Sequence, residues 1–373
     1  MLDVSRGLIM KEKILREIYD DNLKEKIRLK RLENGKVIFT AVPVGKMNDN
    51  VVCMEKPMLA HIRLTSMCNL NCSYCYAHDN SKTKDMSDEQ LFQLIELCNE
   101  KGIMNITWTG GEPLLRDIFI QALNKANKCG INQTVLTNGK LLNQLELKDI
   151  PKENLTFQIS LNNVWENLSY IDDVIKNARM LVKKSYNVMI TVMMKVIDIS
   201  RVENLIKKLV AYEIPSVRFG VEIFVGGLKD EDMNEYEMNI KKMFGDLYDL
   251  REQYRDKINI FYQFDKIRYI NTGFPKRFLI CEAGTTQIYI DNNGDVYPCP
   301  LFKANKEFYC GNVFLQSWEE LWKSSPMQKF RVIKECSGCE YQCMVWCRAL
   351  VYGKNKNLYG KSPYCLHRLD ANY

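Results

Sequence analysis

Short apolar runs alternate with amphipathic stretches through the middle of this chain, and this pattern limits the fold more than any other feature of the sequence. Several runs have strand character: residues 61–65, 105–113, 133–139, 155–162, 188–196 and 217–224. Stretches with a helical spacing of apolar residues separate them, such as 87–101, 116–128 and 199–212. Repeated strand–helix units need right-handed crossovers and give a parallel sheet, either open or curved into a full or partial barrel. Ligands of such sheets gather at the carboxyl ends of the strands.

The pattern differs on either side of this region. The first 55 residues predict a charged helix followed by a hairpin in residues 27–43. Residues 230–257 predict a long surface helix that closes the central region. Residues 285–300 alternate apolar and polar side chains around the turn sequence NNGD, which marks a second hairpin. We therefore expect three parts, which cover residues 1–55, 56–265 and 266–373.

Composition narrows the class of protein. The 373 residues are 46% hydrophobic, enough for a sizeable core, and the net charge of +6 comes from interleaved acidic and basic residues, which does not favour nucleic-acid binding. No run approaches the roughly 20 apolar residues of a membrane span, and the start of the chain lacks a signal-peptide core, so we expect a cytoplasmic protein. Fourteen cysteines in a reducing compartment suggest metal binding or catalysis rather than disulfides.

The first group of cysteines is Cys68, Cys72 and Cys75, directly after the predicted strand 61–65. Three thiolates on one short loop suit one metal centre at the carboxyl end of the sheet. A zinc ion with His78 as the fourth ligand is one possibility. A cubane iron-sulfur cluster is another, and it would keep one iron open because three cysteines hold the other three.

This CxxxCxxC spacing, with the aromatic Tyr74 before the last cysteine, resembles the radical S-adenosylmethionine superfamily. The resemblance implies an α/β fold with a partial (β/α)6 barrel over roughly residues 58–265. It also implies that the open iron binds the amino and carboxylate groups of S-adenosylmethionine. One electron from the cluster then releases a 5′-deoxyadenosyl radical, which abstracts a hydrogen from the substrate. An electron donor of flavodoxin or ferredoxin type follows from the same resemblance.

Several positions carry over to the cofactor site. Gly110, Gly111, Glu112 and Pro113 match the family's GGEP segment, which contacts the cofactor's ammonium group, although such a segment alone also reads as a strand-ending turn. The remaining candidates near the cofactor are Tyr74, Thr137, Asn138 and Ser160. Many members read SLDG where this chain reads SLNN from Ser160, so ordinary strand-end polarity is an alternative there. Lys195 and Arg218 either line the pocket or are solvated charges at its rim.

The second group of cysteines resembles the SPASM extension of the same superfamily, a cysteine-rich α+β region that holds two auxiliary cubane clusters. The resemblance implies that Cys281, Cys299 and Cys347 serve the first auxiliary cluster. The second would take Cys336, Cys339, Cys343 and Cys365. The chain has three residues between Cys339 and Cys343 where the usual pattern has five. In total we expect three [4Fe–4S] clusters.

Other cysteines and histidines leave alternatives. Cys310 either completes the first auxiliary cluster or is a buried thiol, and without it that cluster has an open iron. A zinc ribbon of Cys336, Cys339, Cys343 and Cys347 is the other interpretation of the tail. Four residues show no partner pattern and are expected to have structural roles: Cys98, Cys129, His61 and His367.

SPASM-bearing relatives largely modify peptides, so the resemblance favours maturation of a ribosomally made peptide by a crosslink, a thioether or an epimerisation. Oxidation of Cys or Ser in a sulfatase is less favoured, because Pro300 follows Cys299 where those relatives have an Asp base. Radical chemistry on a small molecule such as a tetrapyrrole is the second enzymatic alternative. A cluster-bearing scaffold or redox sensor is the non-enzymatic one. Residues 27–43 offer a surface for docking a leader peptide by strand addition, and the oligomeric state stays open.

Overall fold

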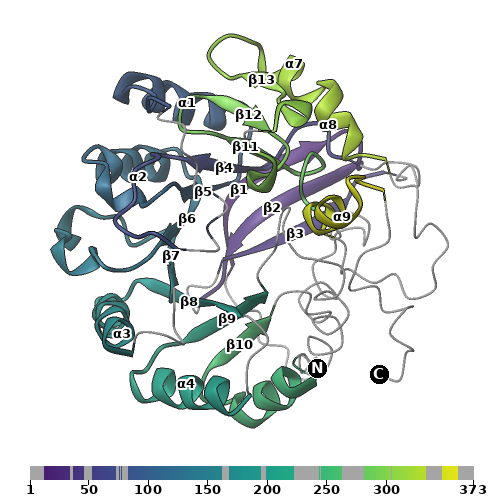
Figure 1. Ribbon diagram of the computed structural model, residues 1–373. Coiled ribbons are helices and arrows are strands. Elements are labelled where there is room, and N and C mark those ends of the chain that lie inside the picture. Colours follow the sequence, from purple (N-terminus) through teal and green to yellow (C-terminus); the bar gives the residue numbers. More distant parts are fainter. Residues whose placement is uncertain are drawn as a thin grey trace.

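The computed structural model describes residues 12–33, 37–45, 53–72, 75, 77, 83–161, 168–194, 199–221, 243, 245–262, 281–303, 305–332 and 347–359. The predicted strand–helix alternation is present (Figure 1). Its parallel strands are β4 (Leu59–Arg63), β5 (Asn105–Thr109), β6 (Asn132–Thr137), β7 (Leu155–Ser160), β8 (Asn187–Met194), β9 (Ser216–Val221) and β10 (Asn259–Tyr262). The helices between them are α1 (Asp88–Glu100), α2 (Phe119–Lys128), α3 (Leu168–Lys183) and α4 (Ile199–Ala211).

These strands lie in chain order in one sheet, and each pairs in parallel with the next from β4 to β10. Helices α1 to α4 all lie along the same face of the sheet (Figure 1). Over the described residues the ladder runs from β10 at one edge to β13 at the other. The α/β class with a mostly parallel sheet is therefore confirmed.

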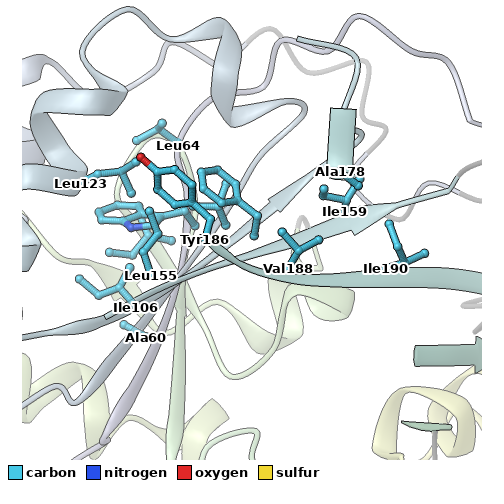
Figure 2. Packing of buried hydrophobic residues seen from close by; sticks show 14 of the residues in the cluster. Ala60, Leu64, Ile106, Leu123, Leu155, Ile159, Ala178, Tyr186, Val188 and Ile190 are labelled. Carbon is cyan, nitrogen blue, oxygen red and sulfur yellow. The ribbon is translucent and has the colours of Figure 1, made fainter. Parts of the chain in front are cut away.

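The core lies between this sheet and the helices. Every second residue of a strand faces the helices, so Ile106, Val188 and Ile190 are buried together with Leu123 of α2 and Ala178 of α3 (Figure 2). The alternate residues face the opposite side, and there the strands carry hydroxyl, amide and charged groups instead of a continuous apolar surface. The sheet therefore has a packed outer face and a polar inner face.

The N-terminal region corrects the prediction of a helix. Residues Lys13–Asp20 form strand β1, which pairs antiparallel with β2 (Glu25–Arg31), and β2 pairs with β3 (Val37–Pro43). The predicted hairpin in residues 27–43 is confirmed. Pairing decides the conformation of β1, because one face of this sheet buries Leu23, Ile27 and Leu29 in a small core and the backbone bonds of β2 satisfy those of β1.

This three-stranded sheet lies at the amino ends of the parallel strands. Arg16 of β1 donates to the Asn99 carbonyl at 2.6 Å and to the Cys129 carbonyl at 3.0 Å, at the ends of the helices that lead into β5 and β6. Arg31 forms a 2.8 Å ion pair with Glu153, just before β7. The cysteine loop follows β4 at the carboxyl end, so the N-terminal sheet and the loop lie at opposite ends of the strands.

The C-terminal region continues the main sheet. Strand β11 (Gln287–Ile290) pairs in parallel with β4, and β12 (Asp295–Tyr297) pairs antiparallel with β11, which confirms the second predicted hairpin. The remaining elements there are β13 (Gly311–Asn312), α7 (Trp318–Trp322), α8 (Ser325–Lys329) and α9 (Arg348–Asn355). Of the helix predicted over 230–257, residues 245–254 are helical, and most of the rest lies outside the described residues.

Short 3-10 turns complete the architecture: η1 (Pro113–Leu115), η2 (Leu142–Gln144), η3 (Leu147–Asp149), η5 (Pro300–Phe302) and η6 (Lys306–Phe308). Among the helices that the structure describes, none is long and apolar enough to cross a membrane.

Candidate active site

The cysteine loop begins where β4 ends and runs beside the segment that follows β5. The Leu64 amide donates to the Thr109 carbonyl at 2.7 Å, the Gly111 amide to Thr65 at 2.7 Å, and the Glu112 amide to Met67 at 2.8 Å. These bonds extend the pairing of the two strands past their ends. The position of Cys68 is therefore fixed by the backbone of the GGEP segment.

Gly110 and Gly111 permit this close approach. A Cβ atom on Gly110 would lie 2.9 Å from the Thr65 carbonyl oxygen, and one on Gly111 would lie 2.0 Å from the Met67 carbonyl oxygen. The second distance is far inside van der Waals contact, and the obstacle is backbone, which has little freedom to move. The predicted contact of this segment with the cofactor stays a prediction, and in the structure the glycines admit the cysteine loop.

Glu112 is the centre of a buried polar group. One carboxylate oxygen accepts the Thr137 hydroxyl at 2.7 Å and the Leu114 amide at 3.2 Å, and the other accepts the Asn138 amide at 2.8 Å. The residue is 1% exposed, and burial raises the pKa of its carboxyl although these three donors oppose the change. Three donors hold the carboxylate in one orientation at the carboxyl ends of β5 and β6.

Asn138 connects this group to the loop. Its side-chain amide donates to the Asn69 side chain at 2.7 Å, and its backbone carbonyl accepts the Tyr170 hydroxyl at 3.1 Å. The structure thus brings together five of the predicted cofactor residues, Gly110, Gly111 and Glu112 with Thr137 and Asn138 around them. Asn69 is a residue that the sequence interpretation missed, and its place between Cys68 and Cys72 was the available signal.

Ser160 ends β7 on the polar inner face. It pairs in register with Thr191 of β8, which pairs in turn with Arg218 of β9, and Arg218 pairs with Phe261 of β10. The neighbouring register of Ile159, Ile190 and Val217 faces the helices, so the first set faces inward. Tyr74, His78 and Lys195 lie outside the described residues.

The loop suits an iron-sulfur cluster chemically. The residue Cys68 is exposed as a whole, yet desolvation of its thiol raises its pKa, and so do the nearby Glu112 and Cys75, whereas the amides of Leu70 and Asn69 oppose the rise. Backbone N–H groups directed at cysteine sulfur are a feature that tunes iron-sulfur clusters. The Cys75 amide donates to the Cys72 carbonyl at 3.1 Å, a turn that keeps both residues on the loop.

The structure also brings Cys281, Cys299 and Cys347 together, though they are distant in sequence. Burial raises the pKa of Cys299 well above its usual value, and the adjacent Cys281 and Cys347 raise it further. Burial, and to a smaller extent the nearby Cys281, raise the pKa of Cys347 to about 12. A bound cluster would offset the mutual repulsion of buried thiolates, so this set suits a metal group. It was predicted from the SPASM resemblance.

Cys310 has different surroundings. It is 7% exposed, its thiol donates to the Phe308 carbonyl at 3.5 Å, and burial raises its pKa to about 11, partly opposed by Ser324 and Met327. Cys98 is fully buried in the main core, in agreement with its predicted packing role. Other predicted residues lie outside the described residues: Cys336, Cys339, Cys343, Cys365 and His367. Within the part of the chain described, no three Cys, His, Asp or Glu side chains form a site for a single ion.

Family models match both regions. The model of the radical SAM superfamily matches residues 62–241, and that of the SPASM iron-sulfur cluster-binding domain matches residues 281–344. The chain belongs to the radical SAM superfamily. It is an iron-sulfur enzyme of oxidoreductase type with a SPASM domain, and the resemblance predicted from its cysteines is confirmed.

Individual relatives agree with this assignment. The chain is 25% identical over 341 residues to the antilisterial bacteriocin subtilosin biosynthesis protein AlbA of Bacillus subtilis (strain 168). This match covers 83% of this chain and 70% of AlbA. Among solved structures, SuiB of Streptococcus suis bound to S-adenosylmethionine has a TM-score of 0.67 at 18% identity, covering 84% of this chain and 78% of SuiB. SuiB has also been solved bound to the precursor peptide SuiA.

A second solved structure is anSMEcpe with bound AdoMet, with a TM-score of 0.63 at 18% identity, covering 84% of this chain and 91% of that one. At these identities the structural matches support the fold alone. They agree with the parallel sheet and its C-terminal extension described above.

Proposed function

We propose that this enzyme cleaves S-adenosylmethionine reductively at Cys68, Cys72 and Cys75 and uses the resulting radical to modify a peptide. The observation that carries the proposal is the packing of the GGEP segment on the cysteine loop: Glu112 is oriented by three donors directly beside Cys68. A [4Fe–4S] cluster on these thiols would supply the electron and the open iron.

Within this site the chain's own residues bind and orient the cofactor. Glu112 offers a fixed, buried carboxylate, which suits the ammonium group of S-adenosylmethionine because a charge-assisted contact is strongest away from water. Thr137 and Asn138 hold that carboxylate, and Ser160 extends the polar surface along the strand ends. Tyr74 is proposed to contact the cofactor as well, by resemblance.

We further propose two auxiliary [4Fe–4S] clusters. Cys281, Cys299 and Cys347 would hold the first, which the mutual effect of their thiols on pKa supports. Cys336, Cys339, Cys343 and Cys365 would hold the second. Because the thiol of Cys310 bonds to the Phe308 carbonyl, we propose that the first cluster keeps an open iron rather than taking Cys310 as a fourth ligand.

A peptide is the substrate class that the inner face of the sheet supports best. Thr107, Thr134 and Thr156 form a register row of hydroxyl groups there, and Ser160, Thr191 and Arg218 form a second row nearer the carboxyl ends. Such rows suit a substrate rich in amide donors and acceptors. AlbA is described as a bacteriocin biosynthesis protein, which points to a ribosomally made peptide.

Anaerobic reconstitution with iron and sulfide counting, together with a dithionite-driven assay for 5′-deoxyadenosine, tests the proposal. We expect about twelve irons per chain and cofactor cleavage. Replacing Cys68, Cys72 and Cys75 by Ala should abolish cleavage and remove about four irons, whereas the control Cys129→Ala should change neither. Undiminished cleavage in the triple variant would refute the site.

The substrate is tested separately. A peptide encoded next to this gene should change mass when it is incubated with the reduced enzyme and S-adenosylmethionine. Should a co-purifying porphyrin change mass instead, the small-molecule alternative would replace the peptide. Iron without any cofactor cleavage in well-reconstituted enzyme would favour the scaffold or sensor.

A further inference from the structure

The turn between β11 and β12 reaches out of the C-terminal region and contacts the segment that leaves the cysteine loop. Asn292 in this turn is fully buried although it is polar. Its backbone carbonyl accepts the Met86 amide at 2.6 Å, and its side-chain amide donates to Asp85 Oδ1 at 2.8 Å and to the Thr83 carbonyl at 3.3 Å. One residue therefore holds three positions between the cysteines and α1.

Arg63, the last residue of β4, makes a second connection. It is 1% exposed, and one guanidinium nitrogen lies 3.1 Å from Asp291 Oδ1 and 3.3 Å from Asn292 Oδ1. The other donates to the Ala77 carbonyl at 3.0 Å. Ala77 is two residues past Cys75, so this side chain joins the hairpin turn to the end of the CxxxCxxC segment.

Asp85 closes the connection at the start of the loop. The oxygen that accepts from Asn292 also accepts the Ser66 amide at 3.1 Å. The entry to the loop at Ser66 and its exit at Asp85 are thus held together, and the partner that fixes Asp85 comes from the C-terminal region. A buried network of this kind is rigid while all its members are satisfied, and loses its geometry when one is removed.

The same turn is continuous with the second group of cysteines. The Tyr289 hydroxyl donates to Asp291 Oδ1 at 3.2 Å. Tyr289 belongs to the core cluster against which Cys281 and Cys299 pack. The contacts therefore run from the proposed auxiliary site, through the turn, to the loop of the proposed radical site.

We propose that Asn292 and Arg63 are positioning residues of the radical site. Through them the hairpin of β11 and β12 holds the cysteine loop against the GGEP segment. The inference rests on the proposed function, because it takes this loop to carry the radical-generating cluster. Neither residue touches the cofactor in this proposal. Their role is to fix the loop between Ser66 and Met86, so their loss should weaken cofactor binding more than turnover.

Hydrogen exchange in the cluster-loaded enzyme without S-adenosylmethionine is the first measurement, on peptides that contain Ser66 and Met86. Asn292→Ala should speed exchange there about tenfold, the scale of one lost buried hydrogen bond. The matched control is Asn293→Ala, in the same turn, whose side chain bonds to Asp295 within the hairpin. It should leave these rates unchanged.

Two further readouts separate positioning from general stability. In Asn292→Ala the KM for S-adenosylmethionine should rise about tenfold with a smaller change in kcat. The change in the electron paramagnetic resonance spectrum of the reduced enzyme on adding the cofactor should also require about tenfold more cofactor, while the iron content stays at the wild-type level.

Arg63→Lys keeps the charge but lacks the two-armed geometry, so it should also speed exchange at Ser66 and Met86 and raise the KM. This variant replaces Asn292→Ala in the test if Asn292→Ala fails to fold. Rates and KM in either folded variant that match Asn293→Ala would overturn the proposal. If wild-type enzyme binds clusters but does not cleave the cofactor, the proposed function fails, and the exchange rates still decide whether the turn holds the loop.

Discussion

At the scale of single residues, Gly111 and His61 each set one property of the protein. Gly111 is required because the Met67 carbonyl occupies the place of a Cβ atom. His61 lies in β4 between Thr107 and Tyr289 of the adjacent strands, and desolvation lowers its pKa from the usual 6.5 to about 4. The first residue sets the geometry of the loop, and the second ties folding to pH.

Gly111→Ala should displace Met67 and Cys68, because the obstacle is backbone rather than a movable side chain. We expect loss of the radical-site cluster and of cofactor cleavage, measured by iron content and 5′-deoxyadenosine. Gly45→Ala is the matched control, since a Cβ there meets only Lys24 at an ordinary 3.6 Å. Full cluster content in Gly111→Ala would contradict the tight packing.

The lowered pKa of His61 means that the unfolded chain takes up a proton below about pH 6.5 whereas the folded chain does so only near pH 4. The free energy of unfolding should therefore decrease as the pH falls from about 6.5 towards 4. Comparing unfolding of wild type and His61→Gln at about pH 7.5 and pH 5.5, we expect wild type to lose up to about 1 kcal/mol more. Equal losses would show that His61 is protonated when folded.

At the scale of elements, the N-terminal sheet contacts the amino ends of the parallel strands, whereas the turn between β11 and β12 lies at the carboxyl end of β4. Arg16 anchors the first at the ends of α1 and α2, away from the cysteine loop. The leader-docking role predicted for residues 27–43 stays a prediction, and it would require a peptide to reach from the amino ends of the strands to the opposite end.

Arg16→Ala should loosen the N-terminal sheet without changing the radical site. Its guanidinium is half-buried against two helix ends, and removing it leaves the Asn99 and Cys129 carbonyls without this donor. We expect faster exchange in β1 and β2 and a stability loss of about 1–3 kcal/mol, with cofactor cleavage unchanged. Arg28→Ala, which removes an exposed pair with Glu17, is the control. A matching loss of cleavage would show that the two ends are coupled.

At the scale of the molecule, the C-terminal region is part of the main sheet rather than an attached unit. Strand β11 covers the edge of β4 along Leu59–Ile62, and Asp291 pairs with the buried Arg63. The proposed boundary near residue 266 therefore separates cysteine groups, while the hydrogen-bonded sheet runs across it.

Removal of residues 281–373 should consequently destabilise the whole protein. The truncation exposes the backbone of β4 as a free edge and leaves Arg63 without Asp291, and exposed edges promote aggregation. Size-exclusion chromatography should show aggregated material. A monomeric truncated chain with an intact radical-site cluster would show instead that the central region folds independently.

The sequence by itself determined the alternation of strands and helices, both hairpins, the cysteine loop and its family, because each depends on local spacing or turn chemistry. The N-terminal helix was wrong, since pairing with β2 overrode the local preference of Lys13–Asp20. The gathering of Cys281, Cys299 and Cys347 was expected only from the family resemblance, and tertiary structure alone joined Arg63 to Asn292 across more than two hundred residues. Such contacts depend on sheet order and register, which no local pattern encodes.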